Sequence, residues 1–357
     1  DKEQNELYKR ISKFFSIERM WELFEQHFGL HHLKEKDNLN DLLGNLLFQH
    51  FSRDALFEIE HLSNKYYSTR SNICALLIDD WMRGTNEEKE ILESYIRTTE
   101  STWQLQHYLQ EKTAEEIEKV TTFPIIDAIL IEKVRNELLY KTTDLTAWKE
   151  RITFRQKTYW GSKEKFSGLY TCLYHAVKLT EYKTNLKQYD SHEDLYGQYV
   201  HSLHYIDQAY RQFMHAYSNL LQRDFIDSLE DKLTNWYENI YLRKLADETN
   251  YYLENEQKTR IPLQRRFFRT NVQPILEKEP TKVFVIISDA LRYEAGYELC
   301  QQLNQLEYGE ASISPLFASL PSYTQLGMAS LLPFKQLAMD ESKTIYADGI
   351  SSLGIAN

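Results

Sequence analysis

The sequence predicts a mainly helical N-terminal region followed by the start of an α/β domain. Over residues 1–260, proline and glycine are scarce and apolar residues recur about every 3.6 positions, the period of an amphipathic helix. Six of the seven prolines lie between Pro262 and Pro333, whereas all eleven histidines lie at or before His215. Because both distributions change near residue 260, we place the main domain boundary there.

Three segments show the helical pattern. Pro124 suits the first turn of a helix, where no backbone N–H is needed, and residues 125–139 then supply an apolar face. Thr85 and Glu88 have the spacing of a capping box, in which each side chain binds the backbone N–H of the other residue. Between residues 194 and 229, aromatic and aliphatic side chains recur in steps of three to five, which predicts one long amphipathic helix.

We divide the chain into three parts. Residues 1–260 form an all-helical region with room for two subdomains, because no strand-like alternation interrupts the helical pattern. Residues 261–281 form a linker, and residues 282–357 begin the α/β domain. The segment 125–131, the most apolar of the helical region, is far shorter than the roughly 20 residues of a membrane-spanning helix.

The α/β part is predicted from four consecutive elements. Residues 283–287 are apolar and mostly β-branched, the pattern of a parallel strand buried on both faces. A helix is predicted over 290–306, a second strand over 311–318 and a second helix over 325–332. In an open α/β sheet of this kind, ligands collect outside the carboxyl ends of the strands.

Asp289 and Thr324 are both predicted to lie outside the carboxyl ends of the strands, where an open α/β sheet binds ligands. A carboxylate that follows a buried strand can hold a divalent cation, and a hydroxyl at a helix N-terminus lies where backbone N–H groups favour negative charge. A metal ion beside that hydroxyl would lower its pKa and make it a nucleophile toward phosphorus. The alternative is helix capping, by Asp289 for the first helix and by Ser322 or Thr324 for the second.

Two motifs add a family resemblance. The segment V-F-V-I-I-S-D-A-L-R-Y-E at 283–294, followed by S-L-P-S-Y-T-Q-L-G-M-A-S-L-L-P at 319–333, resembles the alkaline phosphatase superfamily. Within it, the match is to the PglZ proteins of bacteriophage exclusion (BREX) systems, of type 1, over roughly residues 280–357. The resemblance implies an anti-phage phosphatase or phosphodiesterase, acting on a phosphate ester such as nucleic acid. It also implies Thr324 as the nucleophile, Asp289 as a metal ligand, and two divalent ions, zinc in most members.

The distribution of histidines limits what this chain can do alone. The superfamily's remaining metal ligands are Asp and His residues after the nucleophile. In this sequence no histidine follows His215, and the aspartates after Thr324 are Asp340 and Asp348. Two strands are also too few for a stable sheet. We therefore expect an N-terminal fragment of a longer protein, inactive by itself even where the longer protein is an enzyme.

Overall charge and local charge predict different partners. The net charge of −11 argues against a protein that coats nucleic acid. Residues 141–165, however, carry seven lysines and arginines against three acidic residues, and residues 258–269 carry no acidic residue. These segments predict contact with DNA, or else solvated helix faces. The candidate contact residues are Lys149, Arg151, Arg155 and Lys157 in the first segment and Arg265, Arg266 and Arg269 in the second.

The aromatic and cysteine contents suggest a partner and a compartment. Of the 25 tyrosines and six tryptophans, most lie in the helical region, where they either fill the core or form a surface for a partner protein. The second interpretation predicts an assembly module that recruits other BREX components and needs no catalysis. The three cysteines are far apart and form no C-x-x-C motif, which favours a reducing cytoplasm.

Overall fold

The structure is a computed structural model in which two compact units are distinguished. Asp1–Glu181 with Gln212–Leu233 make up the first unit, and Tyr182–Arg211 with Thr234–Asn357 make up the second. The predicted division at residues 260 and 281 stays a prediction. The ends of both basic segments, 141–144 and 258–259, lie outside the described residues, as do 279–281. The structure describes residues 9–10, 13–14, 16–30, 39–140, 145–183, 186, 188–255, 260–278, 282–306 and 309–351.

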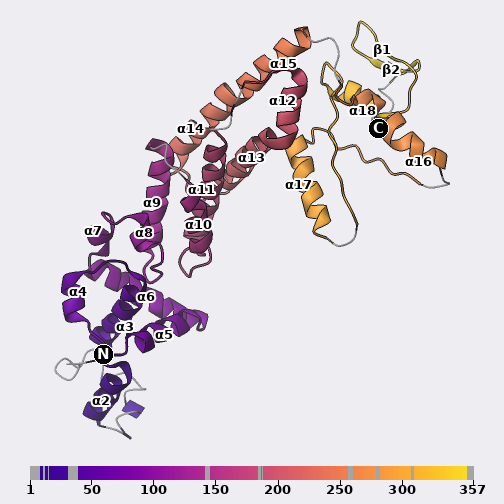
Figure 1. Ribbon diagram of the computed structural model, residues 1–357. Helices are drawn as coiled ribbons and strands as arrows, with labels where there is room; N and C mark the ends of the chain where they lie inside the picture. The colour runs from indigo at the N-terminus through magenta and orange to yellow at the C-terminus, as the bar shows by residue number, and fades with distance from the viewer. Residues whose placement is uncertain are drawn as a thin grey trace. The chain divides into compact units, whose positions relative to one another are not determined.

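The first unit is helical in all its described elements (Figure 1). None of the described helices of the chain is long and apolar enough to cross a membrane. Two later helices, α13 (His204–Ser218) and α14 (Asp227–Trp236), contribute residues to both units. The preceding helices are α2 (Ile17–Phe28), α3 (Leu39–Asp54), α4 (Glu60–Lys65), α5 (Ser71–Met82), α6 (Asn86–Thr102), α7 (Leu105–Leu109), α8 (Ala114–Ile117), α9 (Ile125–Tyr140), α10 (Thr146–Arg155) and α11 (Glu164–Tyr182).

Aromatic side chains build much of the first unit's core. Trp103 packs edge-on against Phe48 and Phe123, with ring centroids 6.2 and 5.6 Å apart, and Phe51 meets Phe123 at 5.7 Å. These four side chains are all buried, so they remove a large apolar area from water. For Trp103, the core interpretation of the tyrosine and tryptophan content is correct.

The expected helix starts are confirmed. The helix α9 begins at Ile125, directly after Pro124, and Thr85 forms a complete capping box with Glu88 at the start of α6. Thr113 and Glu116 form a second capping box at α8, which sequence reasoning missed although the Thr-x-x-Glu spacing was visible. Each cap satisfies two N–H groups that the helix itself leaves unpaired.

The prediction of one long helix over 194–229 is wrong in its second half. Helical structure runs from His192 through a π-helical turn to Ser218, and a new helix starts at Asp227. The side-chain amide of Asn219 donates to the His215 carbonyl (2.9 Å), while the Asn219 backbone N–H turns to Ala216 (3.3 Å). A side chain that bonds to a helix carbonyl in this way competes with the helical backbone hydrogen bonds.

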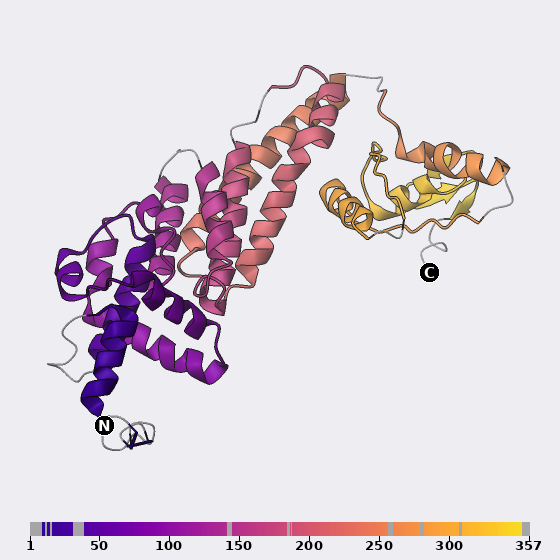
Figure 2. The same ribbon diagram turned by 60° about the horizontal axis from the view of Figure 1, so that its bottom comes forward.

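The second unit combines helical segments with a small antiparallel sheet, drawn in yellow in Figure 2. The order of the described strands is β1–β2–β3. Its elements are α12 (His192–Gln198), the π-helical turns η4 (Tyr199–Leu203), η5 (Tyr237–Leu242) and η7 (Phe268–Val272), the 3₁₀ turn η6 (Gln264–Arg266), α15 (Arg243–Asn255), α16 (Gln273–Lys278), α17 (Tyr293–Asn304), α18 (Thr324–Leu331), β1 (Leu337–Met339), β2 (Ile345–Ala347) and β3 (Ile350–Ser351).

The two predicted parallel strands are not formed by the described residues. Residues 283–287 are extended but unpaired, and Phe284 and Ile286 are 85% and 93% exposed. In the segment 311–318, Phe317 forms one isolated parallel bridge with Leu263. A strand buried on both faces needs neighbouring strands, and the described part of the chain supplies none here. The two helices predicted to follow are present as α17 and α18.

The antiparallel sheet was missed by sequence reasoning. Strands β2 and β3 pair Ala347 with Ile350, so Asp348 and Gly349 form a two-residue hairpin loop. Both loop residues have positive φ, +52° and +83°. An Asp-Gly pair between apolar residues is a strong hairpin signal, and it was visible in the sequence.

Candidate active site at Asp289 and Thr324

Asp289 lies in an exposed turn between the extended segment 282–288 and the helix α17. The next residue, Ala290, has a φ of +57°, which is unusual for a residue with a Cβ atom. The residue that precedes α17 is Arg292, and no side chain caps this helix end. Asp289 therefore does not serve as the helix cap that the alternative interpretation required.

Thr324 is the first residue of α18, and its side chain is exposed. Tyr323 occupies the cap position, and no side-chain hydrogen bond caps this helix either, so neither Ser322 nor Thr324 acts as its cap. Instead, the Thr324 hydroxyl donates to a carboxylate oxygen of Asp289 at 3.3 Å. Two residues 35 positions apart are thus brought together at the ends of two different segments.

The loop before α18 is fixed by Gln264. The Gln264 side chain accepts a hydrogen bond from the Ser319 backbone N–H (3.0 Å). The Gln264 backbone N–H donates to the Phe317 carbonyl (2.9 Å). Farther along, the Ser319 hydroxyl donates to the hydroxyl of Ser330 on α18 (2.7 Å). The turn η6 and the helix α18 also pack against each other, so the start of this helix has a defined position.

The described residues do not fit a two-metal site. They contain no group of three or more His, Cys, Asp or Glu side chains that could hold a metal ion. Asp340 accepts hydrogen bonds from Ser342 (2.6 Å) and from the Thr344 backbone (2.9 Å). Asp348 accepts from the backbone of Gln336 at 2.8 Å. Asp340 is thus used by its own turn, and Asp348 by the backbone that precedes β1. Among the described residues, Asp289 is the aspartate that contacts Thr324.

The first basic segment is largely neutralised by the fold. Arg155 is fully buried and forms a bidentate ion pair with Asp127, at 2.9 and 2.6 Å. The prediction that Arg155 contacts nucleic acid is therefore wrong, because its guanidinium is sequestered from any polyanion. Lys149 pairs with Glu181 (2.8 Å), and Arg151 pairs with Glu118. Lys157, in contrast, is exposed.

The second basic segment is presented to solvent. Arg265, Arg266 and Arg269 are exposed on η6 and η7. Arg269 donates to the Phe334 carbonyl at 3.3 Å. Because η6 packs against α18, the arginines of this turn belong to the same part of the second unit as Thr324.

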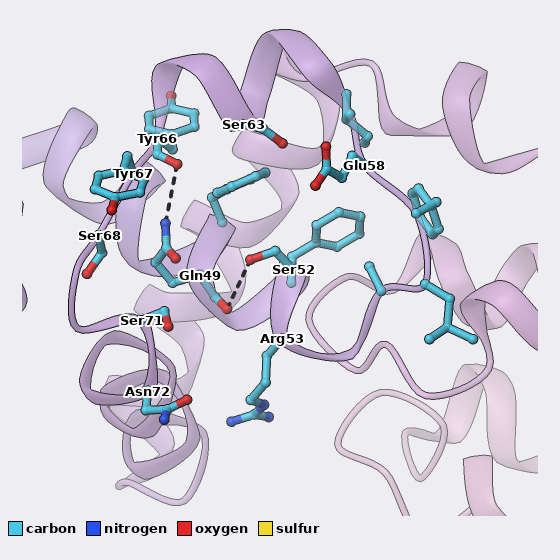
Figure 3. A pocket seen from close by; sticks show the side chains of 16 residues that line it. Gln49, Ser52, Arg53, Glu58, Ser63, Tyr66, Tyr67, Ser68, Ser71 and Asn72 are labelled. Atoms are coloured by element: carbon cyan, nitrogen blue, oxygen red, sulfur yellow. Dashed lines mark hydrogen bonds between the residues drawn. The ribbon is translucent and has the colours of Figure 1, made fainter.

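A cavity of about 660 Å³ in the first unit was not anticipated from the sequence. Figure 3 shows polar and aromatic side chains around it, from α3, the segment 55–59, α4, the segment 66–68 and the start of α5. The Gln49 amide donates to the Tyr66 carbonyl at 3.3 Å on one wall. Leu56 and Tyr67 also line the cavity and are strongly exposed. No local sequence signal marks this site, although all the residues that line it lie between residues 48 and 72.

Comparisons with known proteins identify what the chain is similar to. Residues 267–357 match the profile of the family described as "BREX system PglZ alkaline phosphatase-like domain". The chain is 32% identical, over 364 residues, to "Alkaline phosphatase-like protein PglZ" of Bacillus cereus (strain H3081.97), covering 100% of this chain and 42% of that protein. It is 30% identical, over 363 residues, to "Alkaline phosphatase-like protein BrxZ" of Escherichia coli O9:H4 (strain HS), covering 95% and 41%. No solved structure matches the chain significantly.

These matches define the class of protein as alkaline phosphatase-like, as the motifs around Asp289 and Thr324 predicted. More narrowly, residues 267–357 match the PglZ domain of BREX systems, and the chain as a whole is similar to a PglZ and a BrxZ protein. It spans about two fifths of the length of the two curated relatives. The similarity to them extends through the helical N-terminal region as well as the segment that carries the motifs.

Proposed function

We propose that the protein is a metal-dependent hydrolase of phosphate esters in a BREX anti-phage system, with Thr324 as its nucleophile. The observation that carries this proposal is the 3.3 Å contact between the Thr324 hydroxyl and the Asp289 carboxylate. The capping alternative is removed for both residues, since neither helix end uses them as caps. Asp289 is proposed as one ligand of two divalent ions, zinc by resemblance.

The chemistry proposed for Thr324 is a displacement at phosphorus. Its oxygen attacks the phosphoryl group and the alcohol of the ester departs, after which water releases the phosphate and restores the hydroxyl. The position of this hydroxyl at the first residue of α18 supports the proposal, because the N–H groups of a helix start favour the negative charge of a phosphate. Nucleic acid is the proposed source of the ester.

Enzyme assays with aryl phosphate monoesters and diesters, in the presence of Zn²⁺ or Mn²⁺, test the assignment on the protein at its natural length. We expect Thr324→Ala and Asp289→Ala each to lower kcat/KM by about 100-fold or more. Ser322→Ala is the matched control, because Ser322 is exposed, lies two residues before Thr324 and does not cap α18. Unchanged turnover in either test variant would exclude the proposed roles.

The shortage of ligands gives a second test of the same proposal. Residues 1–357 alone should show no turnover above background, because the described residues offer one aspartate at the site and no metal-binding cluster. Turnover by residues 1–357 that disappears in Thr324→Ala would contradict this expectation. It would mean that Thr324 needs no further metal ligands.

We propose, as a second function, that residues 1–260 recruit other BREX components in the cytoplasm. The observation in its favour is the cavity of the first unit, whose lining includes the exposed side chains Leu56 and Tyr67. An exposed apolar side chain beside a cavity is a common anchor for a partner protein. The three cysteines, all free thiols, agree with a reducing compartment.

Binding of the purified natural-length protein to each purified BREX protein tests this recruitment. We expect Leu56→Ser with Tyr67→Ser to weaken one of these interactions about tenfold or more. Leu221→Ser is the matched control, since Leu221 is similarly exposed in the first unit but does not line the cavity. Equal binding by both variants, or no binding by the unmodified protein, would count against the assembly function.

We also propose that Arg265, Arg266 and Arg269 contact DNA. Their exposure and the packing of η6 against α18 support this proposal, since they put exposed guanidinium groups in the same unit as the proposed nucleophile. Arginine suits this role because it binds phosphate in a bidentate manner and stacks on bases.

A further inference from the structure

The helix that follows Asp289 is held by an ion pair from a distant part of the chain. Arg211, on α13, donates to Glu294 in the first turn of α17 through three hydrogen bonds of 3.1, 3.0 and 2.8 Å. A second contact joins Arg211 to Glu298, one turn farther along α17. The guanidinium of Arg211 therefore forms ion pairs with two carboxylates on one face of this helix.

The buried state of Glu294 makes this contact important. Its side chain is only 1% exposed, whereas that of Arg211 is 42% exposed. An ionised carboxylate in such a position needs a charged, hydrogen-bonding partner, because burial without one is costly. Arg211 is that partner, so its loss would leave the first turn of α17 with a buried and unpaired charge.

Aromatic contacts connect the same two helices. The hydroxyls of Tyr205 and Tyr297 lie 2.9 Å apart. The ring of His204 packs against those of Tyr293 and Tyr297, with centroids 5.3 and 4.6 Å away. These contacts align the helices over two turns, but the ion pair is the contact closest to the start of α17 that involves a buried charge.

Asp289 depends on this helix for its position. Only three residues separate Asp289 from Tyr293, where α17 begins, and one of them is Ala290 in its left-handed conformation. On the other side, residues 283–288 make no backbone hydrogen bond to another described residue. A shift of the first turn of α17 would therefore move Asp289 relative to Thr324.

We propose that Arg211 is a positioning residue of the candidate active site. Its ion pair with Glu294 fixes the first turn of α17 and thereby keeps the Asp289 carboxylate within hydrogen-bonding distance of Thr324. The expected effect of Arg211 on catalysis rests on the proposed hydrolase function. Its expected effect on the position of α17 and Asp289 does not. The helical segment 204–211 thus has a role in shaping the site.

Hydrogen–deuterium exchange of the natural-length protein tests the structural part without any assay of activity. We expect Arg211→Gln to speed the exchange of residues 289–298 about tenfold, while α9 in the first unit exchanges as before. Tyr205→Phe is the matched control, because it removes the Tyr205–Tyr297 hydrogen bond on the same helix pair and leaves the ion pair intact. Unchanged exchange of 289–298 in a folded Arg211→Gln protein would overturn the proposal.

Kinetics test the catalytic part. We expect Arg211→Gln to lower kcat on an aryl phosphate about 10- to 100-fold with little change in KM, because a misplaced catalytic group affects the chemical step. Arg211→Lys should restore part of the rate, whereas Tyr205→Phe should stay near the unmodified value. Faster exchange with unchanged kcat would overturn the positioning role. Activity that survives Thr324→Ala would instead contradict the proposed function and leave the exchange result to decide the structural part.

Discussion

The two basic segments of the chain have similar compositions and opposite environments. In the first unit, Arg155 is buried against Asp127, and Arg151 is paired with Glu118. In the second unit, Arg265 and Arg266 are exposed on a short turn. The difference teaches that a local excess of positive charge predicts an open basic surface only where the fold brings no acidic partner to it.

The buried arginine shows how completely the fold can satisfy a charge. Besides its ion pair, the Arg155 guanidinium donates to the carbonyls of Glu118 (3.2 Å) and Val120 (2.6 Å). Asp127 in turn accepts a hydrogen bond from the Tyr170 hydroxyl at 2.7 Å. Burial, and then the charge of Asp127, raise the pKa of Tyr170, so this phenol remains a neutral donor. The cluster of Arg155, Asp127 and Tyr170 therefore stabilises the interior and is not accessible to ligands.

The largest expected effect is on stability, from breaking the buried pair. Arg155→Met should lower the free energy of unfolding of the first unit by about 3–5 kcal/mol, because it leaves Asp127 buried without its cation. Urea unfolding followed by tryptophan fluorescence measures this, since five of the six tryptophans lie in the first unit. Lys157→Met, at an exposed site two residues away, should stay within about 0.5 kcal/mol. A similar loss in both variants would remove the contrast between buried and exposed cations.

The next effect concerns the exposed cluster and tests the proposed DNA contact. Replacing Arg265, Arg266 and Arg269 together by Gln should weaken binding to a DNA duplex about tenfold or more at low salt. The number of counterions released on binding, measured from the salt dependence of the affinity, should fall by about two to three. Replacing Lys149 and Arg151 by Gln should change neither, because these side chains are already paired with Glu181 and Glu118. Fluorescence anisotropy at several salt concentrations makes the comparison. Equal losses from the two sets would show that the arginine cluster has no special role.

The smallest effect concerns another buried, titratable side chain of the first unit. His50 lies between Thr122 (2.6 Å) and Asp79 (3.1 Å), with Arg53 and Asp54 nearby. Burial lowers the pKa of His50, despite the opposing effect of Asp79. Below about pH 6.5 the unfolded chain therefore takes up a proton that the folded chain resists, and stability falls as the pH falls toward the lowered pKa.

Unfolding at pH 7.5 and at pH 5.5 measures this contribution. The loss of stability on acidification should be smaller in His50→Gln than in the unmodified protein, by about 1 kcal/mol or less. The quantity to compare is the change in the free energy of unfolding between the two pH values. The substitution also removes hydrogen bonds of His50, and that loss lowers stability at both pH values. An identical change in the two proteins would contradict a lowered pKa for His50.

Several elements could be predicted from local sequence alone. The capping box at Thr85, the helix after Pro124 and the helices α17 and α18 follow from residue spacing within one segment. The proximity of Asp289 and Thr324 was expected for a different reason, since the sequence placed both outside the carboxyl ends of predicted strands, where ligands of an open α/β sheet collect.

Other features depend on partners that the local pattern does not contain. The apolar run 283–287 predicts a buried strand, but the described residues supply no neighbouring strand to cover it. Arg211 looks like an ordinary surface residue of an amphipathic helix, and its role as a partner of Glu294 appears only when α13 and α17 meet. The cavity lined by Gln49, Leu56 and Tyr67 likewise forms only when the chain between residues 48 and 72 folds around it.

The sequence by itself determined the helical character, the change of composition near residue 260, the family and the two residues of the candidate site. Tertiary structure alone decided which charges are available: it buried Arg155, exposed Arg265 and joined Arg211 to Glu294. The physical reason is that hydrogen bonds and caps within a helix act over three or four residues, whereas burial and ion pairing depend on side chains that the fold brings from tens of positions away.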